Sequence, residues 1–179
     1  MQPIISIVGR SESGKTTLLE GLIAELKRRG HKVAVIKHSA EDVTVDTVNK
    51  DTWRFTRAGS DISAISSGHN LGIFRRLNHD IGPQELAHLV ADCDLILTEG
   101  FKRSSYPKIE VHRREQGSGL ISPPEELLAV VTDEPLEIGV PQFSKDRIQE
   151  IADLVEQRLL ASQREEDVKE RKPGRSDPL

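Results

Sequence analysis

The residues with the clearest capacity for chemistry form a glycine-rich stretch near the start of the chain, GRSESGKTT at positions 9–17. Gly9, four residues, Gly14, Lys15 and Thr16 match every fixed position of a phosphate-binding loop, or P-loop (the Walker A pattern). In such a loop the glycines bring backbone amides close to phosphate oxygens, the lysine faces the β- and γ-phosphates, and the hydroxyl ligates Mg²⁺. The residues that we expect to hold a nucleotide's phosphates are Gly9, Arg10, Ser11, Glu12, Ser13, Gly14, Lys15, Thr16 and Thr17.

The segments on either side have the patterns needed to position this loop. Residues 4–8 are apolar and mostly β-branched, which is typical of a buried strand in a parallel sheet. Residues 15–29 have apolar side chains at helical spacing and are followed by Gly30, and 32–37 read as a second buried strand. Together they predict a βαβ unit whose helix directs the positive end of its dipole at the phosphates.

A magnesium ion at this loop would need a carboxylate in addition to the Thr16 hydroxyl. Glu99 ends the apolar run CDLILTEG, and the carboxyl ends of parallel strands lie at one edge of a sheet. We therefore predict that Thr16 and Glu99 are metal ligands. Asp46, in the loop after the second strand, is a further candidate for the metal or its bound water, although many loop acids are simply solvated.

Cationic residues gather at the same predicted edge. Lys37 and His38 end the second strand, which indicates an anionic ligand, either the nucleotide or a second substrate; the alternative is a solvated strand end. Arg54 and Arg57 lie on a predicted short helix and could meet a phosphate or the acidic groups of a partner. For these two arginines an ordinary charged helix surface is the competing interpretation.

Recognition of a guanine base would require a suitably placed acceptor. Asp133 follows the apolar run LLAVV, and a carboxylate can accept both the N1–H and the N2 amine of guanine, which adenine cannot match. An ordinary loop acid remains the alternative. The NKD segment at 49–51 resembles a guanine-reading signature, but position 52 is threonine and the segment precedes the Glu99 strand.

The remaining pattern predicts one α/β domain over residues 1–161, a mostly parallel sheet flanked by helices around a P-loop nucleotide site. Further strands are expected at 61–66, 70–76, 93–99, 107–113 and 127–133, and further helices at 83–92 and 144–160. Residues 162–179 are highly charged, so we predict a disordered or frayed tail.

The bulk composition excludes several classes of function. The chain has 179 residues and a formal net charge of −4, which gives no reason to expect nucleic acid or an anionic membrane as a partner. Cys93 is the single cysteine, so no disulfide can form within the chain. No apolar run approaches the ~18 residues of a membrane span, and we expect a cytoplasmic protein.

Taken together, the motifs resemble the molybdopterin-guanine dinucleotide biosynthesis protein B family over residues 4 to about 160. The segments that carry the resemblance are GRSESGKTTLLEGLIAEL, VIKHS, KDTWRFTRAGS, DLILTEGFKRSSYPKIEVHR and VVTDEPL. The P-loop alone is shared by very many proteins. The IKH, EGFK…PKIE and TD-x-P portions make the resemblance specific.

The resemblance implies a homodimeric GTP-binding adapter of molybdenum cofactor synthesis with at most weak Mg²⁺-dependent GTPase activity. Its partner would be a guanylyltransferase, protein A, which joins GMP to molybdopterin and releases pyrophosphate. Lys37 and His38 would belong to the phosphate side of the site. Lys102, Arg54 and Arg57 would be candidates to meet the pterin phosphate or the partner. Two alternatives remain open from the residues: a small-molecule kinase, or an ATP-dependent ligase of the dethiobiotin synthetase type.

Overall fold

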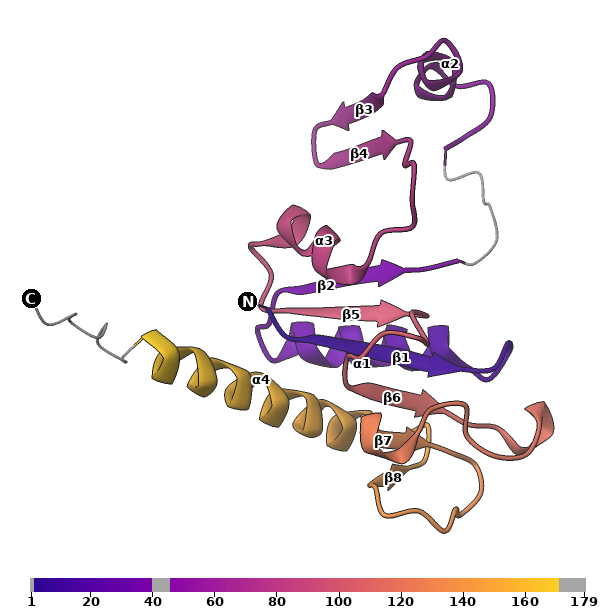
Figure 1. Ribbon diagram of the computed structural model, residues 1–179, viewed down its shortest axis with the longest axis vertical. Helices are drawn as coiled ribbons and strands as arrows, with labels where there is room; N and C mark the ends of the chain where they lie inside the picture. The colour runs from indigo at the N-terminus through magenta and orange to yellow at the C-terminus, as the bar shows by residue number, and fades with distance from the viewer. Residues whose placement is uncertain (1, 40–45, 171–179) are drawn as a thin grey trace, which may run out of the picture. The chain divides into compact units, whose positions relative to one another are not determined.

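The computed structural model describes residues 2–39 and 46–170, with side chains as far as 159. It divides the chain into two compact units (Figure 1). The first unit comprises residues 1–38 and 82–179, and the second comprises the intervening residues 39–81. The single domain expected over residues 1–161 stays a prediction, and the two units are described separately.

The first unit is built on a six-stranded parallel sheet with the order β2-β5-β1-β6-β7-β8 (Figure 1). Its strands are β1 (Ile4–Gly9), β2 (Val33–Lys37), β5 (Leu95–Glu99), β6 (Lys108–Val111), β7 (Leu127–Val131) and β8 (Gln142–Phe143). In the central strand β1, Ile7 is level with Glu99 and Gly9 with Val111, and Lys37 of β2 is also level with Glu99. The register therefore places the ends of β2, β5 and β1 together.

Helices cover both faces of this sheet. On one face lie α1 (Lys15–Arg28) and α4 (Ile148–Glu170), which bury Ile5 and Ile7 of β1. On the other lie α3 (Pro83–Leu86) and the 3-10 turn η1 (Ala87–Val90), whose Ala87 packs with Ile4 and Ile96. Burial of each of these isoleucine side chains contributes about 1.5–3 kcal/mol. Two more 3-10 turns, η2 (Arg114–Gln116) and η3 (Pro124–Glu126), lie between β6 and β7 in sequence.

The predicted class, a mostly parallel sheet flanked by helices, is confirmed. The predicted helix 83–92 is a short α-helix followed by a 3-10 turn, and β8 was not predicted. Helix α4 continues to Glu170, ten residues past the predicted end at 160, and the glutamate, lysine, arginine and glutamine residues of this stretch have high helix propensity. The last nine residues of the predicted tail, 171–179, lie outside the described part. No described helix is long and apolar enough to cross a bilayer.

The second unit contains α2 (Asp51–Arg57) and an antiparallel hairpin of β3 (Ile62–Ser67) and β4 (Asn70–Arg75). The Ser63 hydroxyl donates to the Thr52 carbonyl at 3.2 Å and exchanges a hydrogen bond with Thr56 at 2.9 Å. Ser63 therefore marks the hairpin face that packs on α2. Both strands and the short helix agree with the sequence patterns.

Candidate nucleotide-binding site

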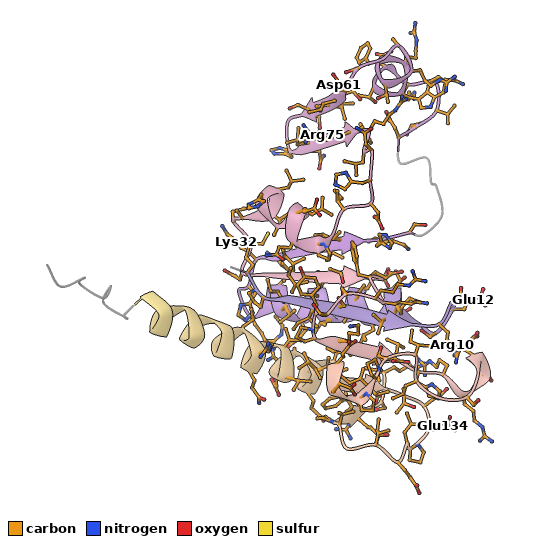
Figure 2. All side chains as sticks on the ribbon, viewed as in Figure 1. Arg10, Glu12, Lys32, Asp61, Arg75 and Glu134 are labelled. Carbon is orange, nitrogen blue, oxygen red and sulfur yellow. The ribbon has the colours of Figure 1, made fainter. Side chains whose placement is uncertain are left out.

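The loop between β1 and α1 has the backbone that the P-loop pattern requires. Gly9 has φ +148°, and a Cβ there would lie 2.4 Å from the Val111 carbonyl oxygen and 2.7 Å from the Ser13 hydroxyl. Gly14 has φ +97° and caps the N-terminus of α1. Both positions therefore need glycine, the first for space and conformation and the second for conformation. Figure 2 shows Arg10 and Glu12 of this loop at the end of β1.

Lys15 lies across the loop, where its ammonium donates to the Arg10 carbonyl at 2.6 Å. Burial lowers the pKa of Lys15; Glu99 acts against this shift, whereas Lys102 and Lys37 add to it. These opposing influences show that three cations and one carboxylate share this part of the sheet edge. Such an excess of positive charge favours a polyanionic ligand.

Two buried polar atoms in the loop support the same conclusion. Among the described residues, the Arg10 Nε and the Ser13 hydroxyl have no hydrogen-bond partner. The Arg10 Nη2 donates to the Ser118 carbonyl at 3.3 Å, so the rest of that side chain is held. Unpaired buried polar groups are costly, and a phosphate oxygen or ordered water is the kind of partner that they would take.

The carboxylate of Glu99 is held between two partners at this edge. The Thr16 hydroxyl donates to its Oε2 at 3.0 Å, and the Lys37 ammonium lies 3.2 Å from its Oε1. A hydroxyl and a carboxylate this close are the hard oxygen donors that Mg²⁺ prefers. The described residues hold no cluster of three His, Cys, Asp or Glu that could hold a metal ion. The structure brings the two residues together, and their role as ligands stays a prediction.

The chain after β5 turns sharply against the end of β2. The His38 amide donates to the Glu99 carbonyl at 2.9 Å, and the ring centroids of His38 and Phe101 are 4.5 Å apart. Gly100 has φ +104°, and a Cβ there would lie 3.0 Å from the His38 carbonyl oxygen. Lys102 is exposed just beyond this turn. The predicted cations Lys37, His38 and Lys102 thus lie around the end of β5.

Asp133 lies beyond β7, on the other side of β1 from Glu99. Its Oδ1 accepts the Arg114 amide at 3.1 Å, and its Oδ2 lies 3.7 Å from the Arg113 guanidinium. The hydrogen bond from the Arg114 amide, with Arg113 nearby, lowers the pKa of Asp133. The group is therefore a carboxylate at neutral pH, with acceptor positions left over for a further donor. Glu134, next in the chain, lies at this same edge in Figure 2.

The remaining predicted residues belong to the second unit. Asp46 accepts from the Thr47 amide at 2.7 Å and the Thr52 hydroxyl at 3.1 Å, which ties it to the start of α2. Arg54 lies 3.8 Å from Asp51. Arg57 lies over the Trp53 ring, 5.8 Å from its centroid. These local contacts involve all three side chains, and their roles toward metal, pterin or partner stay predictions.

Arg113 was not identified from the sequence. Its Nε donates to the Ser13 carbonyl at 3.1 Å, so it contacts the P-loop directly and faces Asp133 as well. The available signal was the segment HRRE, a basic pair that follows the strand PKIEV and reaches the same sheet edge as the P-loop.

The parallel sheet and the loop at the end of its central strand define a protein of the P-loop NTPase fold. The sequence pattern of the family described as molybdopterin guanine dinucleotide synthesis protein B matches residues 4–133. The chain belongs to this family.

Named relatives and solved structures agree with this assignment. A Haemophilus influenzae molybdopterin-guanine dinucleotide biosynthesis adapter protein is 41% identical over 156 residues, which are 86% of this chain and 88% of that protein. The Escherichia coli protein of the same name is 33% identical over 87% of this chain and 92% of its own length. A crystal structure of molybdopterin-guanine biosynthesis protein B matches with TM-score 0.64 and 31% identity over 87% of this chain and 98% of that one. A Bacillus subtilis MobB structure matches with TM-score 0.67 and 25% identity over 86% and 95% of the two chains.

Proposed function

We propose that this protein binds GTP with Mg²⁺ and serves as the adapter of a guanylyltransferase that attaches GMP to molybdopterin. The family places the chain in molybdopterin-guanine dinucleotide biosynthesis. The observation that carries the nucleotide proposal is the 3.0 Å contact of Thr16 with Glu99 beside Lys15 in a complete P-loop. The adapter role rests on the names of the relatives.

In this proposal different residues of the chain bind the phosphates and the metal ion. Amides of residues 9–17 and the N-terminus of α1 hold phosphate oxygens, and Lys15 adds a full positive charge. Thr16 and Glu99 would hold Mg²⁺, which when bound supplies Lewis-acid charge to the phosphate oxygens. The contact between these two side chains fixes their positions before any ligand arrives.

We expect GTP hydrolysis to be slow or absent. Glu99 is held by the Thr16 hydroxyl and the Lys37 ammonium, which favours a role as metal ligand over that of a general base. Turnover by the purified protein near the ordinary enzymatic rate of about 10 per second would contradict this expectation.

Guanine recognition by Asp133 is supported by its place in the sheet. Glu99 ends the strand on one side of β1, and Asp133 follows the second strand on the other side. A nucleotide whose metal lies at Glu99 could extend across the P-loop toward Asp133. The described carboxylate keeps acceptor capacity for the N1–H and N2 amine of guanine.

We also propose that the partner of the hairpin is a second copy of this chain. On the hairpin face opposite the one that packs on α2, Ile62, Leu71 and Ile73 are 45%, 68% and 57% exposed. A two-stranded hairpin with an apolar face is marginal in water unless that face is covered. The homodimer implied by the family resemblance supplies an occupant of matching chemistry.

The adapter proposal is tested by reconstituting the transfer reaction. Purified guanylyltransferase, molybdopterin and GTP are combined with this protein, and formation of molybdopterin-guanine dinucleotide is followed by chromatography. We expect faster product formation with the wild-type protein than without it, and no acceleration with Lys15→Ala. Equal rates in all three reactions would refute the adapter role.

A further inference from the structure

We propose that Arg113 is a positioning residue of the P-loop, which sets the orientation of a phosphate-binding amide and links it to Asp133. This inference rests on the proposed nucleotide binding. Its basis is a chain of contacts from the Ser13 carbonyl through the Arg113 guanidinium to the Asp133 carboxylate. The planar guanidinium of an arginine presents its donors in fixed directions to two separate acceptors, a geometry that the single ammonium of a lysine does not reproduce.

The contact with Ser13 fixes the direction of the next amide. A trans peptide is planar, so the Ser13 carbonyl and the Gly14 N–H point in opposite directions. Arg113 Nε donates to that carbonyl at 3.1 Å. The Gly14 N–H therefore points away from Arg113, as an amide that binds a phosphate must. Because Gly14 has no Cβ, its backbone can adopt other conformations, and the contact with Arg113 limits this freedom.

The position of the guanidinium also has an electrostatic consequence. Its Nη2 lies 3.6 Å from where a Cβ of Gly14 would be, at the N-terminal cap of α1. The first turn of α1 has no acidic residue, so a cation at this positive helix end is unfavourable without a counter-charge. Asp133, held as a carboxylate by the Arg114 amide, supplies it. The same positive charge then favours an incoming polyanion.

The segment that carries Arg113 is anchored independently of its side chain. The His112 amide donates to the Val131 carbonyl at 2.8 Å. The buried carboxylate of Glu110 accepts the amides of Ile121 and Ser122 at 2.7 and 2.9 Å. Because these contacts do not involve the guanidinium, replacing Arg113 should leave the segment folded.

The experiment is calorimetric titration with inorganic tripolyphosphate, which lacks a base, and with GTP, both with Mg²⁺. For Arg113→Ala we expect both affinities to fall about tenfold, the loss of one charge-assisted hydrogen bond. Arg113→Lys keeps the charge but not the fork, so we expect at least a threefold loss. The matched control is Arg147→Ala, because the Arg147 side chain is 61% exposed and its ion pair is with Glu150, which is not a residue of the site. We expect this control to stay within twofold of wild type.

The variant Asp133→Asn distinguishes two roles of Asp133: positioning of the P-loop through Arg113, and recognition of the base. If Asp133 positions the loop through Arg113, this variant weakens tripolyphosphate binding as well as GTP binding. If Asp133 acts on the base alone, tripolyphosphate binding stays unchanged and the link is refuted.

Three other results would overturn the inference: wild-type affinities in Arg113→Ala, wild-type affinities in Arg113→Lys, or a loss confined to GTP. If Arg113→Ala fails to fold by circular dichroism, Arg113→Lys and Asp133→Asn decide the question. Absence of binding by the wild-type protein would instead refute the proposed function, and this inference with it.

Discussion

Replacing Gly9 with alanine tests how closely the P-loop packs on the neighbouring strand. The new methyl group would lie 2.4 Å from the Val111 carbonyl oxygen, so backbone on one side must move by about 1 Å to reach ordinary contact. The positive φ costs roughly 1–2 kcal/mol, and the overpacking about 1–3 kcal/mol more. We expect the free energy of unfolding to fall by about 3 kcal/mol, which for a chain of this size lowers the melting temperature by about 6–12 °C.

The matched control is Gly30→Ala. Gly30 also has a positive φ, +95°, but nothing lies within 4 Å of its added Cβ. We therefore expect Gly30→Ala to lower the free energy of unfolding by only the cost of the positive φ, about 1 kcal/mol. Urea unfolding of both variants followed by circular dichroism gives the comparison. If Gly9→Ala costs no more than Gly30→Ala, the described packing of the loop against β6 is wrong.

Three further predictions address the metal, the acid stability and the assembly. Glu99→Gln should weaken GTP binding about tenfold in the presence of Mg²⁺ and much less in EDTA, as measured by fluorescence titration. Equal losses of affinity under the two conditions would argue against Glu99 as a metal ligand. Hydrogen bonds from Arg28 and Arg29 lower the pKa of Glu25 from 4.5 to about 2. Glu25→Gln should therefore destabilise the fold fully above about pH 4.5, with the difference vanishing toward pH 2; a pH-independent difference in urea midpoint would contradict this. The double variant Leu71→Ser/Ile73→Ser should shift sedimentation toward monomer, and an unchanged dimer would exclude this face as the interface.

The residues that meet at the end of β5 could be predicted from sequence because strand register is simple in a parallel sheet. Glu99 and Lys37 each end an apolar run, and parallel pairing brings such ends to one level. The P-loop could also be predicted from its sequence pattern. Gly9 is required by the nearby Val111 carbonyl, and Gly14 is required by its left-handed φ. The local pattern alone was sufficient for these positions.

Contacts between loops could not be predicted from the sequence in this way. Arg113 reaches Ser13 across 100 positions of sequence, and no periodicity encodes that contact. The end of α4 was placed too early because the absence of apolar residues was taken as the absence of structure. Residues of high intrinsic propensity can extend a helix that already packs, without adding apolar residues to it. The compact unit of 39–81 is not evident from the sequence, because the pattern predicts the strands β3 and β4 but not that they pair with each other.

The most direct test of the account is equilibrium binding of GTP and ATP to the purified protein with Mg²⁺. Lys15→Ala serves as the variant, and Lys145→Ala, at an exposed lysine outside the site, as its control. The account predicts tighter binding of GTP than of ATP by the wild type and by the control, with both lost in Lys15→Ala. Equal affinities, or a preference for ATP, would contradict guanine recognition and favour a kinase or ligase instead.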